Sequence, residues 1–558
     1  MNSFSTTLIF GFSFAAALLI IARLLHYRRA NSRRKRISAL RAQFGKPLHR
    51  NRDFDVYQQF LMHRDAGNTC TVDDQTWGDL DLNSVFSFID RTLSTPGEIE
   101  LHRFLRRVEV SVEVLRERDE AVNFLHAHHA VREQIQLKLN ELGHCDHSIG
   151  LLELIWDGPL PDTRHRRWFD ALGALSVASV FVLVTFRLLH APIPVFAVAM
   201  MIGLFAINMA AHYWSRSRYG YLIHRVRYLS KLIGISGQIS RIEARELGAR
   251  ISGLRALYER TKSIPIATRL VLHNRQDTSD VFGLLQEYFS IFFLTEVRSL
   301  LKAANAICQC RPDLQRLFVA VGEIDALQAV ASFRCEIQDF ARPRFSERKQ
   351  LCIENAVHPL ISQPVPNSVS ITDKQYLITG SNLSGKSTLL RTVGINAVLA
   401  QSIFTCTASC YVGNFFHIMS SITLTDNLLQ GKSFYLAEAE RLLAMIRATM
   451  ESTTVLCIID EALRGTNTTE RVAAASSILG YLSRQNAVVI AATHDNELTE
   501  ILAKNFESHH FTEQIDEEGI HFDYQIRPGS AKSTNAIRLL ELLGYPKDIV
   551  ENAAYFAS

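Results

Sequence analysis

One short stretch of this sequence gathers the residue types that hold phosphate groups: GSNLSGKST, residues 380–388. It follows the short apolar run KQYLIT and precedes LLRTVGINAVLAQ, whose apolar residues recur at helical spacing. A strand, a glycine-bounded loop and a helix in this order are the context that the G-x-x-x-x-G-K-[ST] pattern requires. Because the first N–H groups of a helix point into such a loop, we predict a nucleoside triphosphate site here.

Each residue type in this loop has a chemical reason to be present. The ammonium group of Lys386 would reach the β- and γ-phosphates, and the hydroxyl group of Ser387 would coordinate Mg²⁺. The cofactors that we expect are therefore ATP and Mg²⁺. The predicted nucleotide-binding residues are Gly380, Ser381, Asn382, Leu383, Ser384, Gly385, Lys386, Ser387 and Thr388.

Two further apolar runs end in side chains that suit hydrolysis of the phosphoanhydride bond of ATP. TTVLCIIDE ends in Asp460 and Glu461, and AVVIAATH ends in His494. Asp460 would hold Mg²⁺ together with Ser387, while Glu461 would act as general base toward the attacking water. His494 would sense the γ-phosphate. The predicted catalytic residues are Glu461, His494 and Lys386, and the predicted metal ligands are Ser387 and Asp460.

A glutamate directly after the strand-end aspartate, with a later strand-end histidine, is the arrangement of ATP-binding-cassette proteins. Such proteins work as dimers in which a signature segment completes the partner's site. The candidate segment is DNLLQGKSFYLAEAERLLAMI, where Gly431 and Ser433 precede an amphipathic helix. They would contact a γ-phosphate in trans, or Ser433 would simply cap the helix. Ser433 lies only 47 residues after Lys386 and no LSGGQ occurs, which disfavours a transporter cassette.

These motifs together resemble the MutS family of DNA mismatch-repair ATPases. TGSNLSGKSTLLRTVGINAVLAQ is similar to that family's TGPNMGGKST loop and helix, and DNLLQGKSFYLAE to its D-D-L-x-x-G-x-S-T-F-M-x-E segment. IIDEALRGTNTTE is similar to M-D-E-x-G-R-G-T-S-T, and THDNELTEI to T-H-Y-x-E-L. GSAKSTNAIRLLELLGYPKDIVENA resembles the family's C-terminal segment. The resemblance runs from about residue 350 to 555 and continues more faintly upstream, in 76–106 and from Val321.

The resemblance implies a fold class: an α/β P-loop NTPase domain of the ABC type, preceded by an all-α core and lever domain, with about three transmembrane helices added. The family's Pro and Gly in the phosphate loop are replaced here by Ser381 and Ser384. Before the core only about fifty residues follow the first apolar segment, and no Phe-x-Glu motif occurs among these residues. We therefore do not expect mismatch recognition.

Three apolar segments have the composition of membrane spans: Phe4–Ala22, Ala171–Phe186 and Pro192–Trp214. Arginines follow the first segment and flank both outer ends of the other two, so the positive-inside rule places the N-terminus outside and the ATPase domain in the cytoplasm. A buried hairpin in a soluble domain is the alternative for the second and third segments. We expect a multi-pass integral membrane protein, in a bacterial inner membrane.

The predicted domains follow from these segments and motifs. They are an N-terminal transmembrane anchor (1–27), a basic cytoplasmic linker (28–75), a MutS-like helical core and lever (76–345) interrupted by a transmembrane hairpin (168–215), and a MutS-type ATPase domain (346–558).

The predicted function is a membrane-anchored MutS-like ATPase that hydrolyses ATP at the composite sites of a homodimer to drive a conformational clamp. Two branches stay open: a DNA-binding protein related to mismatch repair, and a conformational switch for membrane or protein partners. The net charge of +4 does not decide between them. A transport ATPase is disfavoured because three spans rarely form a translocation pathway. No small-molecule substrate other than ATP is expected.

Overall fold

The computed structural model describes most of the chain. The described residues are 23, 27–28, 30–50, 52–64, 71–145, 148–156, 158, 163–189, 191–244, 247–264, 280–337, 339–381, 384–422, 434–464, 467–516, 519–530 and 544–557. The chain divides into two compact units. Unit 1 contains Met1–Lys46, Thr92–Glu98 and Phe124–Gln328, and unit 2 contains Pro47–Arg91, Ile99–Asn123 and Ala329–Ser558.

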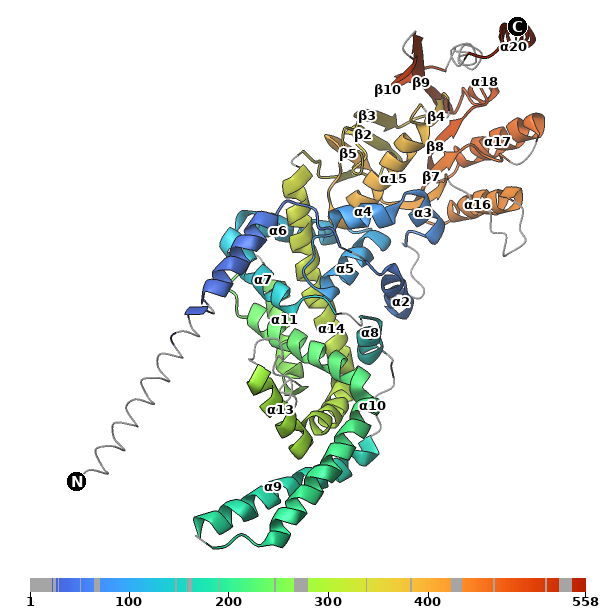
Figure 1. Ribbon diagram of the computed structural model, residues 1–558. Helices are drawn as coiled ribbons and strands as arrows, with labels where there is room; N and C mark the ends of the chain where they lie inside the picture. The colour runs from blue at the N-terminus through green and yellow to red at the C-terminus, as the bar shows by residue number, and fades with distance from the viewer. Residues whose placement is uncertain are drawn as a thin grey trace. The chain divides into compact units, whose positions relative to one another are not determined.

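Unit 1 is built from helices. A helix over residues 30–43 is followed by α7 (His129–Leu142), α8 (Ser148–Ile155), the short 3₁₀ helix η1 (Thr163–His165), α9 (Arg166–Leu188), α10 (Val195–Ile239), α11 (Gly248–Thr261), α13 (Asp280–Phe293) and most of α14 (Thr295–Ile337). The long α10 is the centre of the unit, since it contacts α7, α8, α9, α11 and α13 (Figure 1). The described residues before Arg344 form helices and no extended strand, as expected for the all-α part of the chain.

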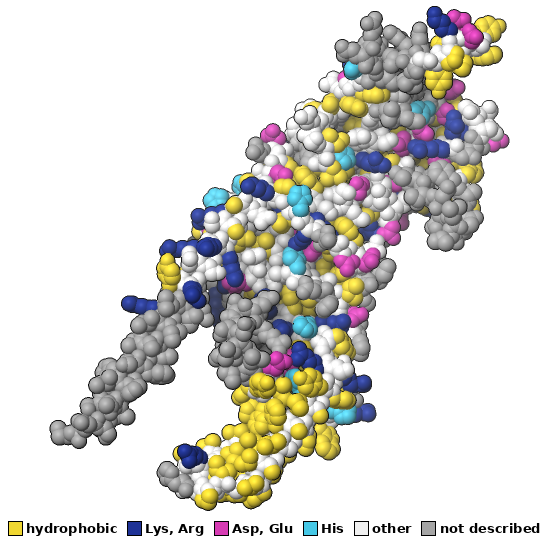
Figure 2. Space-filling view, in the orientation of Figure 1, with side chains coloured by type: hydrophobic (Ala, Val, Ile, Leu, Met, Phe, Trp, Pro, Cys, Tyr) yellow, Lys and Arg dark blue, Asp and Glu magenta, His cyan; other side chains and the backbone are white. Residues whose placement is uncertain are grey.

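Helix α9 and the first half of α10 form an antiparallel hairpin whose outer surface is apolar. Phe181, Val195 and Phe196 are each more than 70% exposed, and Figure 2 shows hydrophobic side chains gathered over this hairpin. Among the described helices, α9 and α10 are long and apolar enough to cross a membrane. The predicted first span, Phe4–Ala22, lies outside the described residues. Helix α10 also continues well past Trp214, to Ile239.

Unit 2 contains a six-stranded sheet in the order β10-β9-β4-β8-β7-β6. The strands are β4 (Gln375–Thr379), β6 (Phe416–Ser421), β7 (Thr454–Asp460), β8 (Ala487–Thr493), β9 (Phe506–Asp516) and β10 (Gly519–Pro528). All neighbours are parallel except the pair β9 and β10. The buried apolar strands β4, β7 and β8 are typical of a parallel sheet that is covered on both faces.

Helices cover both faces of this sheet. On one face lies α15 (Lys386–Ile403), which contacts β6, β7 and β8 (Figure 1). On the other face a single core cluster joins alternate strand residues such as Val455, Cys457 and Ile459 to apolar side chains of the covering helices. Those helices are α16 (Phe434–Ala448), α17 (Thr468–Leu482) and α18 (Glu497–Ile501). The sheet therefore has the mixed α/β architecture expected from the sequence.

A second sheet and several N-terminal helices complete unit 2. The sheet has the order β1-β5-β2-β3, with β1 (Arg344–Phe345), β2 (Leu351–Ala356), β3 (Asn367–Ile371) and β5 (Cys410–Gly413). The N-terminal helices are α2 (Phe54–Arg64), α3 (Asp74–Asp79), α4 (Leu82–Ile89) and the parts of α5 (Thr95–Arg106), α6 (Val112–Ala127) and α14 that belong to the unit. A helix over 547–557, α20 (Lys547–Ala557), ends the described chain.

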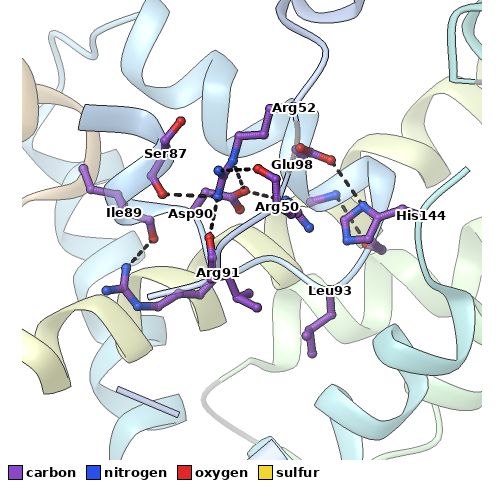
Figure 3. A network of polar contacts seen from close by, with 12 residues as sticks. Arg50, Arg52, Ser87, Ile89, Asp90, Arg91, Leu93, Glu98 and His144 are labelled. Atoms are coloured by element: carbon purple, nitrogen blue, oxygen red, sulfur yellow. Dashed lines mark hydrogen bonds and ion pairs between the residues drawn. The ribbon is translucent and has the colours of Figure 1, made fainter. Parts of the chain in front are cut away.

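The N-terminal segments are fixed to unit 2 by buried polar contacts. Asp79 of α3 accepts hydrogen bonds from the Ser420 hydroxyl (2.6 Å) and the Ile422 N–H (3.0 Å) at the end of β6. At the end of α4, the buried Asp90 accepts from Arg50 and Arg52 (Figure 3). Because an unpaired buried carboxylate is costly, these arginines hold the segment before α2 in place.

The carboxyl end of α15 is held in a similar way. Arg118 of α6 donates to the Ser402 carbonyl oxygen at 2.9 Å, and Arg334 of α14 donates to the carbonyl oxygens of Ile403 (3.2 Å) and Phe404 (3.0 Å). Arg334 also pairs with Asp119 at 2.5 Å. These guanidinium groups satisfy carbonyl oxygens that a helix end leaves without partners and oppose the negative end of the helix dipole.

Candidate functional site

The loop between β4 and α15 is closed at both ends by glycines with positive φ angles. Gly380 has φ 141° and Gly385 has φ 105°. A side chain at Gly380 would lie 3.0 Å from the Ser384 Oγ and 3.1 Å from the Phe511 carbonyl oxygen, so the loop also lacks space for one. The Ser384 hydroxyl donates to the Ser381 carbonyl oxygen at 2.7 Å, which tightens the turn. The central residues, Asn382 and Leu383, lie outside the described part.

Lys386 is the first residue of α15, and its ammonium group points back into the loop. Its Nζ donates to the carbonyl oxygens of Gly380 (2.6 Å) and Ser381 (2.9 Å) and lies 3.2 Å from the Nε2 of His494. The side chain is almost fully buried. A buried ammonium group surrounded by carbonyl oxygens at a helix N-terminus is arranged to exchange these neutral acceptors for an anion.

Three strands end at the same edge of the sheet, beside this loop. The register pairs Thr379 of β4 with Thr493 of β8, and Asp460 of β7 with Ala492 of β8. The residues that follow these ends therefore converge. The Ser387 Oγ donates to the Asp460 Oδ2 at 2.5 Å. A hydroxyl and a carboxylate form a pair of hard oxygen ligands of the kind that Mg²⁺ prefers.

Glu461 is held between the side chains of His494 and Arg464. Its Oε1 lies 2.6 Å from the His494 Nε2, and its Oε2 lies 3.0 Å from the Arg464 Nε. The hydrogen bond with His494, and then the charge of Arg464, lower the pKa of Glu461 although partial burial opposes the shift. Glu461 is therefore ionised at neutral pH. Its backbone is in the left-handed region, with φ 57°, which costs energy for a residue other than glycine.

The turn that carries Glu461 is secured by a second, buried glutamate. Glu438 of α16 accepts hydrogen bonds from the backbone N–H groups of Leu463 (2.6 Å) and Arg464 (3.0 Å). Burial raises the pKa of Glu438 above its ordinary value. Leu463 also has a positive φ of 64°. One carboxylate thus stabilises a turn with two left-handed residues, and this turn positions both Glu461 and Arg464.

The turn after β8 is fixed by an ion pair. Arg471 of α17 binds both carboxylate oxygens of Asp495, at 2.9 and 2.6 Å. The Asp495 N–H donates to the Thr493 Oγ1 at 3.0 Å. These contacts flank His494 in the sequence on both sides, so they limit where its imidazole ring lies.

A pocket of about 360 Å³ adjoins the amino end of α15. It is lined by Ala356, His358, Ile361, Gln363, Pro364, Val365, Asn367, Gly385, Thr388, Leu389, Thr392, Phe511 and Tyr524. Asn367 closes one side, because its side chain donates to the Tyr524 carbonyl oxygen (2.9 Å) and accepts from the Ile526 N–H (2.8 Å). Burial and the nearby charge of Arg391 lower the pKa of His358, so this pocket has a neutral, largely apolar lining.

The structure brings five of the predicted site residues into contact: Lys386, Ser387, Asp460, Glu461 and His494. Gly380, Ser381, Ser384 and Gly385 form the described part of the loop, and Thr388 lines the pocket. Gly431 and Ser433 of the predicted signature lie outside the described residues.

Sequence reasoning did not single out Glu438, Arg464 or the pocket. A signal for two of them was present. Arg464 stands where the resembled D-E-x-G-R segment has its arginine, and Glu438 stands where the S-T-F-M-x-E segment ends. The pocket had no comparable signal, because its lining comes from β2, the following loop, α15, β9 and β10.

Comparison with known proteins agrees with this architecture. Residues 376–558, which include nearly all of the six-stranded α/β sheet, match the family model for MutS domain V. Proteins named DNA mismatch repair protein MutS are similar to the chain. The one from Thermus thermophilus is 32% identical over 237 residues, covering 42% of this chain and 29% of the relative. The one from Geobacillus sp. is 28% identical over 311 residues, covering 53% of this chain and 35% of the relative.

Residues 376–558 therefore match a domain of the MutS family, which agrees with the resemblance described from the motifs. The matches span about a third of the length of the curated relatives.

Proposed function

We propose that this chain is a MutS-type ATPase that binds ATP with Mg²⁺ and hydrolyses it at the site described above. The observation that carries the proposal is the convergence of Lys386, Ser387, Asp460, Glu461 and His494 at one edge of a parallel sheet. Ligands bind at the carboxyl ends of the strands in such sheets, where neighbouring connections diverge. Phosphate binding, metal binding and proton acceptance each have a suitable group there.

The residues fit both cofactors. The loop of residues 380–388 and the start of α15 would hold the phosphates, with Lys386 exchanging its two carbonyl acceptors for phosphate oxygens. Ser387 and Asp460 would ligate Mg²⁺, which when bound neutralises phosphate charge. The adjoining pocket has the size and apolar lining for the base and ribose of a nucleotide.

Glu461 is the proposed proton acceptor. Its lowered pKa keeps it ionised at neutral pH, so it can accept a proton from an attacking water. Its contacts with His494 and Arg464 must loosen before both carboxylate oxygens face that water. Hydrolysis is therefore expected to depend on a rearrangement of these two side chains. His494, which lies beside both Lys386 and Glu461, is placed to respond to an anion at the loop.

The assembly that we propose is a homodimer with composite sites, in which Gly431 and Ser433 act in trans. Its domains would be the anchor (1–27), linker (28–75), core and lever (76–345) and ATPase domain (346–558). ATP binding would close the dimer and move the helical core. Two branches of function stay open: a DNA-binding protein related to mismatch repair, and a switch for membrane or protein partners. No feature of the described residues decides between them.

Membrane insertion is part of the proposal. Helix α9, with 23 residues, is about 34 Å long at 1.5 Å per residue, enough for a hydrocarbon core of about 30 Å. Its apolar side chains face outward, whereas Asn208 of α10 donates inward to the Ser176 Oγ at 2.7 Å. This pattern, apolar outside and polar between helices, suits lipid. The topology would place the N-terminus outside and the ATPase domain in the cytoplasm of a bacterial cell.

The test is the variant Glu461→Gln in the detergent-solubilised full-length chain, with Glu451→Gln, an exposed residue before β7, as control. Loss of the proton acceptor should lower kcat by a factor on the order of 10²–10⁴ while ATP binding persists. Light scattering should then show an ATP-bound dimer. A variant that stays monomeric with ATP and Mg²⁺, and hydrolyses at the wild-type rate, would refute the composite site.

A further inference from the structure

The first helix of unit 1, over residues 30–43, carries a row of cations that the ATPase site does not use. Residues 27 and 28 are also helical. Arg28, Ser32, Lys35 and Ala39 follow one another at steps of four, three and four residues, so they lie on one face of the helix. An open groove of about 480 Å³ runs along this face. Its lining residues are Arg28, Asn31, Ser32, Lys35, Arg36 and Ala39.

The positive charge of this face is uncompensated within the described residues. Arg28, Lys35 and Arg36 are exposed, and the described part of the chain gives none of them an ion pair. Arg41, further along the same helix, pairs with Glu133 instead. Like charges at helical spacing repel one another, so three cations around one groove are stable when an external anion lies between them.

We propose that this face, the cationic stripe of Arg28, Lys35 and Arg36, binds the anionic headgroups of membrane phospholipids. The inference rests on the membrane insertion in the proposed function and names a lipid partner for it. Two neighbouring features favour a lipid surface over nucleic acid. Tyr27, 70% exposed, precedes the stripe, and aromatic residues of this kind mark the membrane interface. The stripe itself contains no aromatic side chain on which a base would stack.

The same unit holds the apolar hairpin, whose ends carry interfacial side chains. Trp168 and Trp214 are exposed where α9 begins and where the apolar part of α10 ends. Phe169 stacks on Trp214, which brings these two ends together. A bilayer around the hairpin would therefore present its headgroups to unit 1, and anionic headgroups attract exposed lysines and arginines within a Debye length.

The chain offers a matched control for the test. Arg33 and Arg34 are exposed on the same helix but do not line the groove, because they lie on another side of the helix from Arg28 and Lys35. The double variant Arg28→Gln/Lys35→Gln and the double variant Arg33→Gln/Arg34→Gln lose the same charge. A difference in lipid affinity between the two double variants would therefore come from the position of the charges on the stripe and not from the net charge.

The experiment is calorimetric titration of the detergent-solubilised full-length chain with dihexanoyl phosphatidylglycerol at low salt. Phosphatidylcholine of the same length and inorganic phosphate serve as separate titrants. The wild type should bind phosphatidylglycerol in a salt-dependent way and bind the other two weakly. Each cation near a membrane surface contributes about fivefold, so the stripe variant should bind about 25-fold more weakly and the control variant nearly as wild type.

Three outcomes would overturn the proposal. Equal weakening in both double variants would mean that net charge alone acts, and equal binding of inorganic phosphate would mean a free-anion site. Binding of duplex DNA would be followed by fluorescence anisotropy. If the stripe variant weakens DNA binding but leaves lipid binding unchanged, the stripe is a nucleic-acid surface. Release of the chain from membranes by alkaline carbonate would instead refute membrane insertion itself.

Discussion

Replacing Glu438 with glutamine should slow ATP hydrolysis without removing ATP binding. Glu438 touches none of the groups that would contact the nucleotide, yet its carboxylate accepts the N–H groups of Leu463 and Arg464. In Glu438→Gln one acceptor oxygen remains, and the other is replaced by an amide nitrogen that faces an N–H group. The turn that carries Glu461 then loses one of its two supporting bonds.

The size of the effect follows from the bond that is lost. A hydrogen bond to a charged group contributes about 1.5–3 kcal/mol, and the turn it holds contains two residues with positive φ angles. If this free energy is needed to keep Glu461 in place in the transition state, kcat falls about 10- to 100-fold, at 1.36 kcal/mol per factor of ten. KM should change little, because the phosphate loop and the pocket do not involve Glu438.

The assay is steady-state phosphate release together with equilibrium binding of a fluorescent ATP analogue. Glu440→Gln, an exposed glutamate on the same helix, is the matched control. Amide hydrogen exchange at residues 463 and 464 gives a readout independent of turnover, and it should become faster in Glu438→Gln only. A Glu438→Gln variant that hydrolyses ATP as the wild type does, or whose rate falls only in step with ATP binding, would refute this role of Glu438.

Two predictions concern the stability of unit 2. Burial, with a smaller effect of Arg106, lowers the pKa of His102 to about 3, so at acidic pH the unfolded chain binds a proton at His102 more readily than the folded chain does. The stability that neutral His102 contributes is complete above pH 6.5 and should be lost as the pH falls toward 3. About 2 kcal/mol of the free energy of unfolding should be lost by pH 5. The urea midpoint, followed by tryptophan fluorescence at pH 7.5 and 5, should therefore drop less in His102→Leu, and an equal drop would exclude His102 as the cause. Arg334→Met should lower the free energy of unfolding by about 3–5 kcal/mol, because it removes the buried partner of the Asp119 carboxylate and also leaves carbonyl groups at the end of α15 without a donor. Arg342→Met, which removes a half-exposed partner of the same Asp119, should cost about 1 kcal/mol or less, and similar thermal midpoints for the two variants would contradict this account.

The local parts of the candidate site could be predicted from the sequence. Each of the strands β4, β7 and β8 is a short apolar run followed by polar residues. Parallel strands bring their carboxyl ends to one edge of the sheet. The predicted runs 374–379, 453–461 and 487–494 agree with the strands to within about one residue at each end. Because each of these signals spans only a few consecutive residues, no tertiary information was needed to find it.

The contacts that secure the site could not be predicted in this way. The resembled segment marks the position of Glu438, but it does not indicate that the carboxylate meets a turn 25 residues later. Leu463 replaces a glycine of the resembled segment and still adopts a positive φ angle, because its side chain is buried in the core cluster. The end of α10 is a similar case: the apolar signal stops at Trp214, but the helix continues because its later residues pack against α7 and α11.

The contacts between early and late segments of unit 2 have a consequence for how the chain folds as it is synthesised. Asp79 and Ser420, which bond to each other, are 341 residues apart. At about 5–20 residues per second, a ribosome needs roughly 20–70 s to pass from one to the other. During that interval α3 has no β6 to pack against, and Leu80, fully buried in the finished fold, has no α15 beside it. Long-range pairing of this kind slows folding and leaves a nascent chain dependent on chaperones.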